Sequence, residues 1–197
     1  MTKDAALSQK TPIRYPGDRP NAQTVICSHV PSHVKTVCSP FLTGGSIELR
    51  LAAGGKLVRA CSHNIELVQY WACAAVDPTR VANVAKEFRP LFDDDETFYD
   101  IRDRRLVPKD PFVRAGIFYA VNRSTEDGTI SCGKLMKGHP KLNELSLLNM
   151  SSFTFSNLYV HHIKDFSDAF NEFDDAFFVC CPYTKFSRKA HLQSSAI

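Results

Sequence analysis

Residues 35–61 follow the pattern of a strand, a glycine-containing loop, a helix and a second strand in close succession. The first strand covers residues 35–38 and leads into the loop SPFLTGGS at residues 39–46. Residues 47–53 have a helical pattern that ends at Gly54 and Gly55, and residues 56–61 form the next strand. This order is the first unit of a Rossmann-like nucleotide-binding fold, so the chain is predicted to be an α/β protein.

The second predicted strand ends at Ser62, His63 and Asn64, where a helix over residues 65–75 begins. This strand end lies about 20 residues beyond the first loop, the distance at which Rossmann-like folds place an acid for a ribose hydroxyl. The loop and the strand end are therefore predicted to lie near one ligand site.

Composition limits the chain to one globular domain, or to one domain that carries a small insert. Its 197 residues are 44% hydrophobic and include 14 Phe, which is enough to bury a sizeable core. The formal net charge of +3 permits a nucleic-acid partner without demonstrating one. No apolar stretch reaches the length of a membrane span, so no membrane partner is expected.

The cysteines favour reduced thiols in an intracellular protein over a disulfide framework. Their number is odd, and they fall within apolar runs as often as in loops, at positions 27, 38, 61, 73, 132, 180 and 181. The N-terminus lacks the apolar segment of a signal peptide. Cys27, His29, His33 and Cys38 are zinc-ligand types, but their spacing matches no common zinc finger, so no metal is expected.

Three parts are predicted along the chain: a polar arm at 1–14, an α/β core at 15–122 and 142–197, and an insert at 123–141. Within the core, Asp77-Pro78 and Asp110-Pro111 mark the starts of further helices. The insert is rich in Ser, Thr and Gly and is expected to form loops or hairpins. It contains a basic cluster, namely Lys134, Lys137, His139 and Lys141.

An apolar run at residues 177–180 predicts a strand that leads into a Pro-Tyr turn at Pro182 and Tyr183. In α/β sheets ligands bind at the carboxyl ends of strands, so this turn is a candidate site. An ordinary buried strand is the alternative interpretation of the same run.

Several of these segments, in the same order, resemble Dam-like DNA adenine methyltransferases. Tyr15, Pro16 and Gly17 resemble the start of the family's Gly-Gly-Lys segment, with Asp18 and Arg19 in place of the second Gly and the Lys. The loop at 39–46 is similar to the family's Glu-Pro-Phe-x-Gly-x-Gly-Ser cofactor loop, and residues 61–64 to its Asn-Asp-x-Asn segment.

The remaining matches lie in the second half of the chain. Residues 118–123, followed by Gly128, resemble the aromatic-Asn-Arg segment that enters the family's DNA-reading insert. Residues 163–166 precede the catalytic strand at the family's usual distance. The family's Asp-Pro-Pro-Tyr motif is represented by Cys180, Cys181, Pro182 and Tyr183. The resemblance covers residues 13–183 and implies a Rossmann-like methyltransferase fold with a small inserted subdomain.

The resemblance also implies an S-adenosylmethionine pocket whose acids are missing here. The family's loop Glu, second-strand Asp and motif Asp are replaced by Ser39, Ser62 and Cys180, and the first loop Gly by Thr43. Loss of two charged hydrogen bonds at roughly 1.5–3 kcal/mol each weakens binding about a hundred- to ten-thousand-fold. The implied cofactor-binding positions are Tyr15, Gly17, Ser39, Phe41, Gly44, Gly45 and Ser62. No bound cofactor is expected unless this degenerate pocket still works.

The motif also lies close to the end of the chain, at Ile197, whereas family members continue with further strands. This predicts an incomplete sheet whose edge is covered by a protein partner or by self-association. The expected function is a non-catalytic structural or interaction component, by analogy in a phage or viral assembly. Its expected location is the cytoplasm of a host cell, or a virion.

Two alternative functions stay open. A DNA-binding module without chemistry would use the basic residues of the insert, namely Arg123, Lys134, Lys137 and Lys141. An active adenine-specific DNA methyltransferase with an atypical pocket would still use the carbonyl of Cys181 and the ring of Tyr183 on a flipped base.

Overall fold

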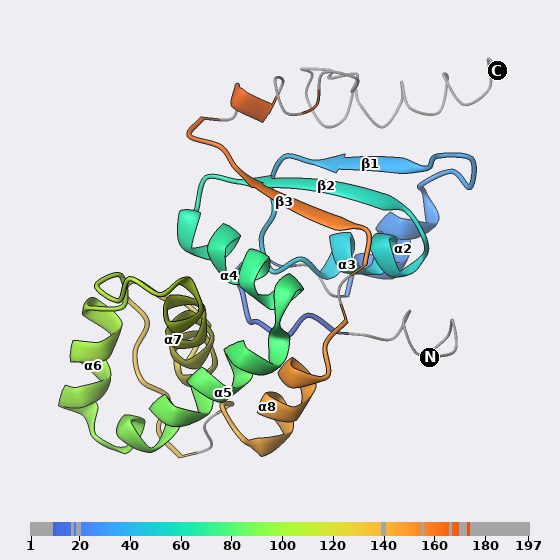
Figure 1. Cartoon of the computed structure of the whole chain (residues 1–197). Helices are drawn as coiled ribbons and strands as arrows, with labels where there is room; N and C mark the ends of the chain where they lie inside the picture. The colour runs from blue at the N-terminus through green and yellow to red at the C-terminus, as the bar shows by residue number, and fades with distance from the viewer. Residues whose placement is uncertain are drawn as a thin grey trace.

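The computed structural model describes residues 10–16, 18, 21–138, 141–154, 156–165, 167–169 and 173. Figure 1 shows a small sheet beside a group of helices. The elements, in chain order, are α2 (Gln23–Ser28), β1 (Thr36–Ser39), α3 (Ser46–Ala53), β2 (Leu57–Ser62), α4 (Ile65–Val76), α5 (Pro78–Phe88), η1 (Arg89–Asp93), α6 (Asp95–Asp103), α7 (Pro111–Ser124), α8 (Glu144–Ser151) and β3 (Leu158–His162). These elements confirm the predicted α/β class.

The three strands form a parallel sheet in the order β1-β2-β3. Helix α3 connects β1 to β2, as expected for the first unit of a Rossmann-like fold. Ser39 pairs with Ala60, and Ser62 pairs with His162. Because the strands run in the same direction, their carboxyl ends meet at one edge of the sheet.

Both faces of the sheet carry packed residues. Helices α3 and α4 contact the strands on one face (Figure 1). A smaller cluster forms around Cys61, with Ile163, Ala169 and Phe173 buried against it. The guanidinium carbon of Arg59 lies 5.4 Å from the centre of the Phe173 ring. Residues that follow β3 therefore return to pack against β2.

The Asp-Pro pairs start helices, as the sequence predicts. The Asp77 carboxylate accepts a hydrogen bond from a first-turn amide of α5 at 2.9 Å, and Asp110 does the same for α7 at 2.8 Å. Pro78 and Pro111 then occupy the first helical positions. A proline fits there because the amide that it lacks would have no helical partner.

Aromatic side chains of α4 and α7 join the sheet layer to the other helices. The ring of Tyr70 lies 5.2 Å from Trp71, 5.1 Å from Phe118 and 6.1 Å from Tyr119, measured between ring centres. The Tyr119 hydroxyl donates a hydrogen bond to the Ser146 carbonyl on α8 at 2.8 Å. Since α4 also covers the sheet, the two parts share one core.

The insert begins in the last turn of α7 and folds back on itself. Thr125 and Leu135 form an antiparallel bridge, and the Glu126 amide donates to the Lys134 carbonyl at 3.0 Å. These contacts pair the two sides of the insert. The division into arm, core and insert stays a prediction.

Several predicted features lie outside the described residues. These are the strand at 177–180, the turn formed by Cys180, Cys181, Pro182 and Tyr183, and the glycine at position 17. Within the described part of the chain, no helix has the length and apolar character needed to cross a membrane.

Candidate functional site

A cavity of about 350 Å³ opens at the carboxyl ends of the three strands. Three of the predicted cofactor positions, Tyr15, Phe41 and Ser62, line it together. Lys164 and Asp165, which directly follow β3, line the same cavity. The geometry thus brings segments that are far apart in the sequence to the edge where Rossmann-like folds bind ligands.

The glycine loop is fixed to the sheet and to helix α4. The Leu42 amide donates to the Cys61 carbonyl at 2.8 Å, which ties the loop to the end of β2. Gly45 has a φ of 76° and precedes the first turn of α3. A Cβ at this position would lie 2.9 Å from the Trp71 ring. Only glycine meets both demands without strain, because it lacks a Cβ and adopts positive φ freely.

The serine that replaces the loop Glu is bound to a different acid. Ser39 Oγ donates to Glu48 Oε1 at 2.6 Å. Glu48 lies on α3 and is only 8% exposed. Burial raises the pKa of the Glu48 carboxyl, the Ser39 hydrogen bond opposes this rise, and nearby Asp18 adds to it.

A second carboxylate, that of Asp18, lies at the start of α3. Ser46 Oγ donates to Asp18 Oδ1 at 2.6 Å. A Cβ on Gly44 would lie 2.7 Å from the Asp18 carboxyl carbon, so the carboxylate packs directly against this glycine. The space beside Gly44 is therefore filled by a side chain of the same protein.

Ser62, at the end of β2, is buried and takes part in the cap of α4. Its Oγ accepts a hydrogen bond from the Asn64 amide at 3.2 Å. The Asn64 side chain in turn accepts from the amides of Glu66 and Leu67. The hydroxyl of Ser62 can still donate one hydrogen bond, but it brings no charge to the cavity.

Glu48 and Asp18 were not among the predicted site residues. Asp18 was noted only as a departure from the family's Gly-Gly-Lys segment. Glu48 stands nine positions after Ser39, and the distance between the two side chains depends on how α3 is docked. A helix that starts directly after a ligand loop is the signal that could have directed attention to its first polar residues.

The predicted nucleic-acid residues differ in their surroundings. The Arg123 guanidinium donates to the Lys141 carbonyl at 3.1 and 3.3 Å and to the Pro12 carbonyl at 3.5 Å. Lys137 forms an ion pair with Asp95 at 2.9 Å, while Lys134 and Lys141 are exposed. Arg123 thus holds backbone segments together, and the lysines lie at the surface.

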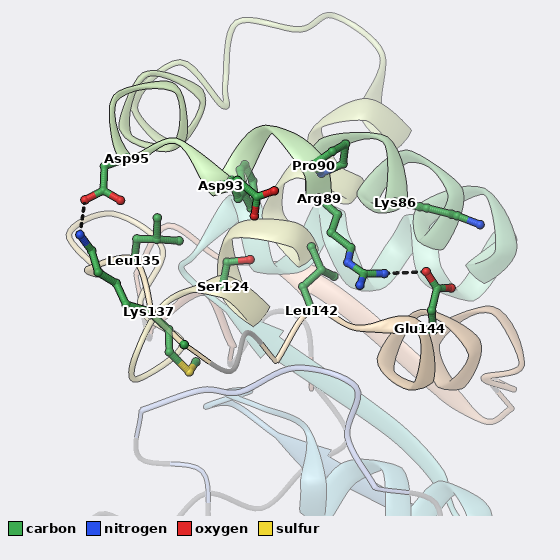
Figure 2. Close-up of a pocket in the computed structure, with 13 residues that line it drawn as sticks. Lys86, Arg89, Pro90, Asp93, Asp95, Ser124, Leu135, Lys137, Leu142 and Glu144 are labelled. Atoms are coloured by element: carbon green, nitrogen blue, oxygen red, sulfur yellow. Dashed lines mark hydrogen bonds and ion pairs between the residues drawn. The ribbon is translucent and has the colours of Figure 1, made fainter.

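A larger cavity of about 720 Å³ lies between η1, the insert and the start of α8. Figure 2 shows the Lys137–Asp95 ion pair at one side and the Arg89–Glu144 ion pair, at 2.5 Å, at the other. Its charged residues are balanced, since Lys86, Arg89 and Lys137 stand against Asp93, Asp95 and Glu144. A groove for a phosphate chain would instead carry an excess of positive charge.

Metal binding gains no support from the described part of the chain. Its histidines, cysteines and carboxylates form no group of three or more that could hold a metal ion.

Comparison with known proteins gives one family match. A family model described as D12 class N6 adenine-specific DNA methyltransferase matches residues 15–194, nearly the whole chain. A search of curated proteins finds no match.

The raised pKa of Glu48 leads to a testable pH dependence. Above the ordinary value of 4.5, the folded protein keeps a proton on Glu48 that the unfolded chain has released. The free energy of unfolding should therefore fall as pH rises from 4.5 through the raised pKa. Glu48→Gln keeps an acceptor for Ser39 but removes this decrease. Urea unfolding, followed by the fluorescence of Trp71, measures it between about pH 4 and about pH 8.

The matched control is Glu87→Gln, which removes an exposed carboxylate of α5. It should keep the pH dependence of the wild type. An unchanged slope in Glu48→Gln would contradict the assignment of this pH dependence to the buried carboxyl.

Proposed function

The chain belongs to the D12 class N6 adenine-specific DNA methyltransferase family, and from this premise we propose that it is a non-catalytic member that acts as a structural or interaction component. The observation that carries the proposal is the state of the two serines at the carboxyl ends of β1 and β2. Ser39 donates its hydroxyl proton to Glu48, and Ser62 accepts from the Asn64 amide. Neither position supplies a carboxylate to a cofactor.

The charges of the cofactor explain why this matters. S-adenosylmethionine carries an ammonium group and two ribose hydroxyls, for which carboxylates are the strongest acceptors. Each lost charged hydrogen bond costs roughly 1.5–3 kcal/mol, so two lost bonds weaken binding about a hundred- to ten-thousand-fold. Cys180, at the motif position, is at best a weak acceptor.

Glu48 does not replace the missing loop acid. It is buried, and its raised pKa favours the neutral form over the charge that a cationic ligand requires. One of its oxygens already accepts from Ser39. The acid is thus part of the wall behind the loop and has little exposed surface to offer to a ligand.

Calorimetry with S-adenosylmethionine tests the loss of the cofactor site. We expect no binding at micromolar concentrations by the wild type. The triple variant Ser39→Glu, Glu48→Ser, Ser62→Asp returns acids to the family's positions and avoids two adjacent carboxylates at the loop. It should bind at least about a hundredfold more tightly, because two charged hydrogen bonds become available.

Glu48→Ser alone is the control, since it removes the buried acid without restoring the others. Micromolar binding by the wild type, or transfer of a labelled methyl group to adenine in DNA, would contradict the proposal and favour an active enzyme with an atypical pocket.

The proposed interaction role requires a protein partner. A free edge of a sheet binds a further strand readily. We propose that a second copy of the chain or another protein covers an edge of the sheet. The setting in a phage or viral assembly rests on analogy within the family.

Light scattering coupled to size exclusion tests self-association. The purified chain should form dimers or larger species as its concentration rises, because self-association is a bimolecular process. A monomer at every concentration would contradict self-association and leave a different protein as the partner to be sought.

The exposed lysines of the insert favour a second candidate function, DNA binding without chemistry. Lys134, Lys137 and Lys141 all lie at the surface of one segment. Retention on duplex DNA across a salt series measures this function. If Lys134 and Lys137 each contact a phosphate, changing both to Glu should weaken binding and lower the salt slope by about 2.

The matched control changes two exposed lysines outside the insert, Lys35→Glu and Lys109→Glu, and so alters net charge equally. Equal losses of DNA binding in the two double variants would show that binding depends on net charge and not on the position of the lysines. That outcome would contradict a DNA-binding surface on the insert.

A further inference from the structure

The N-terminal segment, residues 10–16 and 18, connects the glycine loop to the insert. We call it the strap. Figure 1 draws it in blue between the sheet and the group of helices. Ile13 anchors it, because this side chain is only 2% exposed and belongs to the main hydrophobic core. The strap is therefore part of the packed structure at its centre, while Lys10 and Pro16 are exposed.

The two flanks of the strap, at Thr11 and Asp18, contact the start of α3 and the loop before it. The residue before this helix, Gly45, has no side chain that could cap it. Asp18 accepts the Ser46 hydroxyl at 2.6 Å and packs against Gly44, and the Thr11 hydroxyl donates to the Gly44 carbonyl. In nucleotide-binding folds the N-terminus of this helix receives an anionic group of the ligand. Here a carboxylate of the chain itself lies at that end.

The middle of the strap, at Arg14, holds the insert. The Arg14 amide donates to Asn122 Oδ1 at 2.8 Å, and Asn122 Nδ2 donates to the carbonyls of Arg14 and Gly128. The Arg14 guanidinium donates to the Thr125 carbonyl at 2.7 Å and to the Glu126 carbonyl. Asn122 is fully buried. Main-chain carbonyls of the insert are thus bound directly by Arg14 of the strap and by the side chain of Asn122.

The two contact regions are close along the chain. Asp18 stands four positions after Arg14, and the Asp18 amide donates to the Tyr15 carbonyl at 3.0 Å. This turn connects Asp18 to the residue directly after Arg14. Both contact regions are held by several hydrogen bonds, which makes the strap a connection that docks or releases as a unit.

We propose that the strap couples the glycine loop to the insert, with Asp18 as an internal anion that keeps the strap docked. Release of Asp18 from Ser46 loosens the contacts of Arg14 and Asn122 with the insert, and release of the insert loosens the loop in return. The coupling does not depend on methyl transfer and goes beyond the proposed function.

Hydrogen exchange on the full chain, without any ligand, tests the coupling. The reporters are the insert amides of Glu126 and Met136, which donate to the Lys134 and Ser124 carbonyls, and the α3 amide of Leu49, which donates to the Gly45 carbonyl. Asp18→Ala should speed exchange at the insert reporters by roughly tenfold, the value of about one charged hydrogen bond. Arg14→Ala should speed exchange at Leu49.

The double variant Asp18→Ala, Arg14→Ala gives the sharpest result. If the strap releases as a unit, the second change adds little to the first at either set of reporters. Asn122→Ala should have the same effect as Arg14→Ala, and Arg14→Ala keeps the test valid if the buried Asn122 proves necessary for folding. Asp100→Ala is the control, because the exposed carboxylate of Asp100 forms a local ion pair with Arg104.

The proposal is overturned if Asp18→Ala leaves the insert reporters within about twofold of the wild type while Leu49 changes, since the loop then opens locally. It is also overturned if the effects of Asp18→Ala and Arg14→Ala are additive. Both results are independent of whether S-adenosylmethionine binds. Failure here is therefore distinct from failure of the proposed function.

Discussion

The parallel pairing of β1 with β2 across α3 determines where every other part of the site can lie. A right-handed crossover through one helix places the carboxyl ends of both strands at the same edge. Ser39, Ser62 and the segment after β3 therefore meet there, although more than a hundred residues separate the first from the last. The cavity at this edge follows from the topology, whatever side chains line it.

The side chains then decide what the cavity can hold. An acid at the carboxyl end of a strand faces the ligand, whereas an acid in the first turn of α3 can turn back toward the strand. Glu48 takes the second position and meets the hydroxyl of Ser39, which a carboxylate at position 39 could not supply. Serine at position 39 is thus compatible with a buried Glu48. The carboxyl group of Glu48 lies behind the glycine loop and not at the opening of the cavity. The aromatic residues Tyr15 and Phe41 keep their places at the same edge.

Local sequence signals predicted the parts of the fold that depend on neighbouring residues. Hydrophobic periodicity was enough to predict the strand, loop and helix at 35–61. Helix-capping chemistry was enough to predict the helix starts at Asp77 and Asp110. Side-chain partners across the fold were beyond such signals. Arg123 was grouped with the exposed lysines by charge, yet its guanidinium donates to the carbonyls of Lys141 and Pro12. From the sequence, Asp18 stood out only because it takes the place of the family's second Gly. Its contact with Ser46 joins residues 28 positions apart and could not be predicted from local sequence.

The contacts that hold the insert do not depend on the residues at the carboxyl ends of β1 and β2. Arg14 and Asn122 bind main-chain carbonyls, whose positions depend on the backbone and not on the residues at 39 or 62. Buried amide and guanidinium donors of this kind are costly to leave unpaired, so they preserve the arrangement even without a ligand. Asp18 adds an anion at a helix start whose capping glycine offers no side chain. The strap thereby stabilises the loop with groups from within the chain.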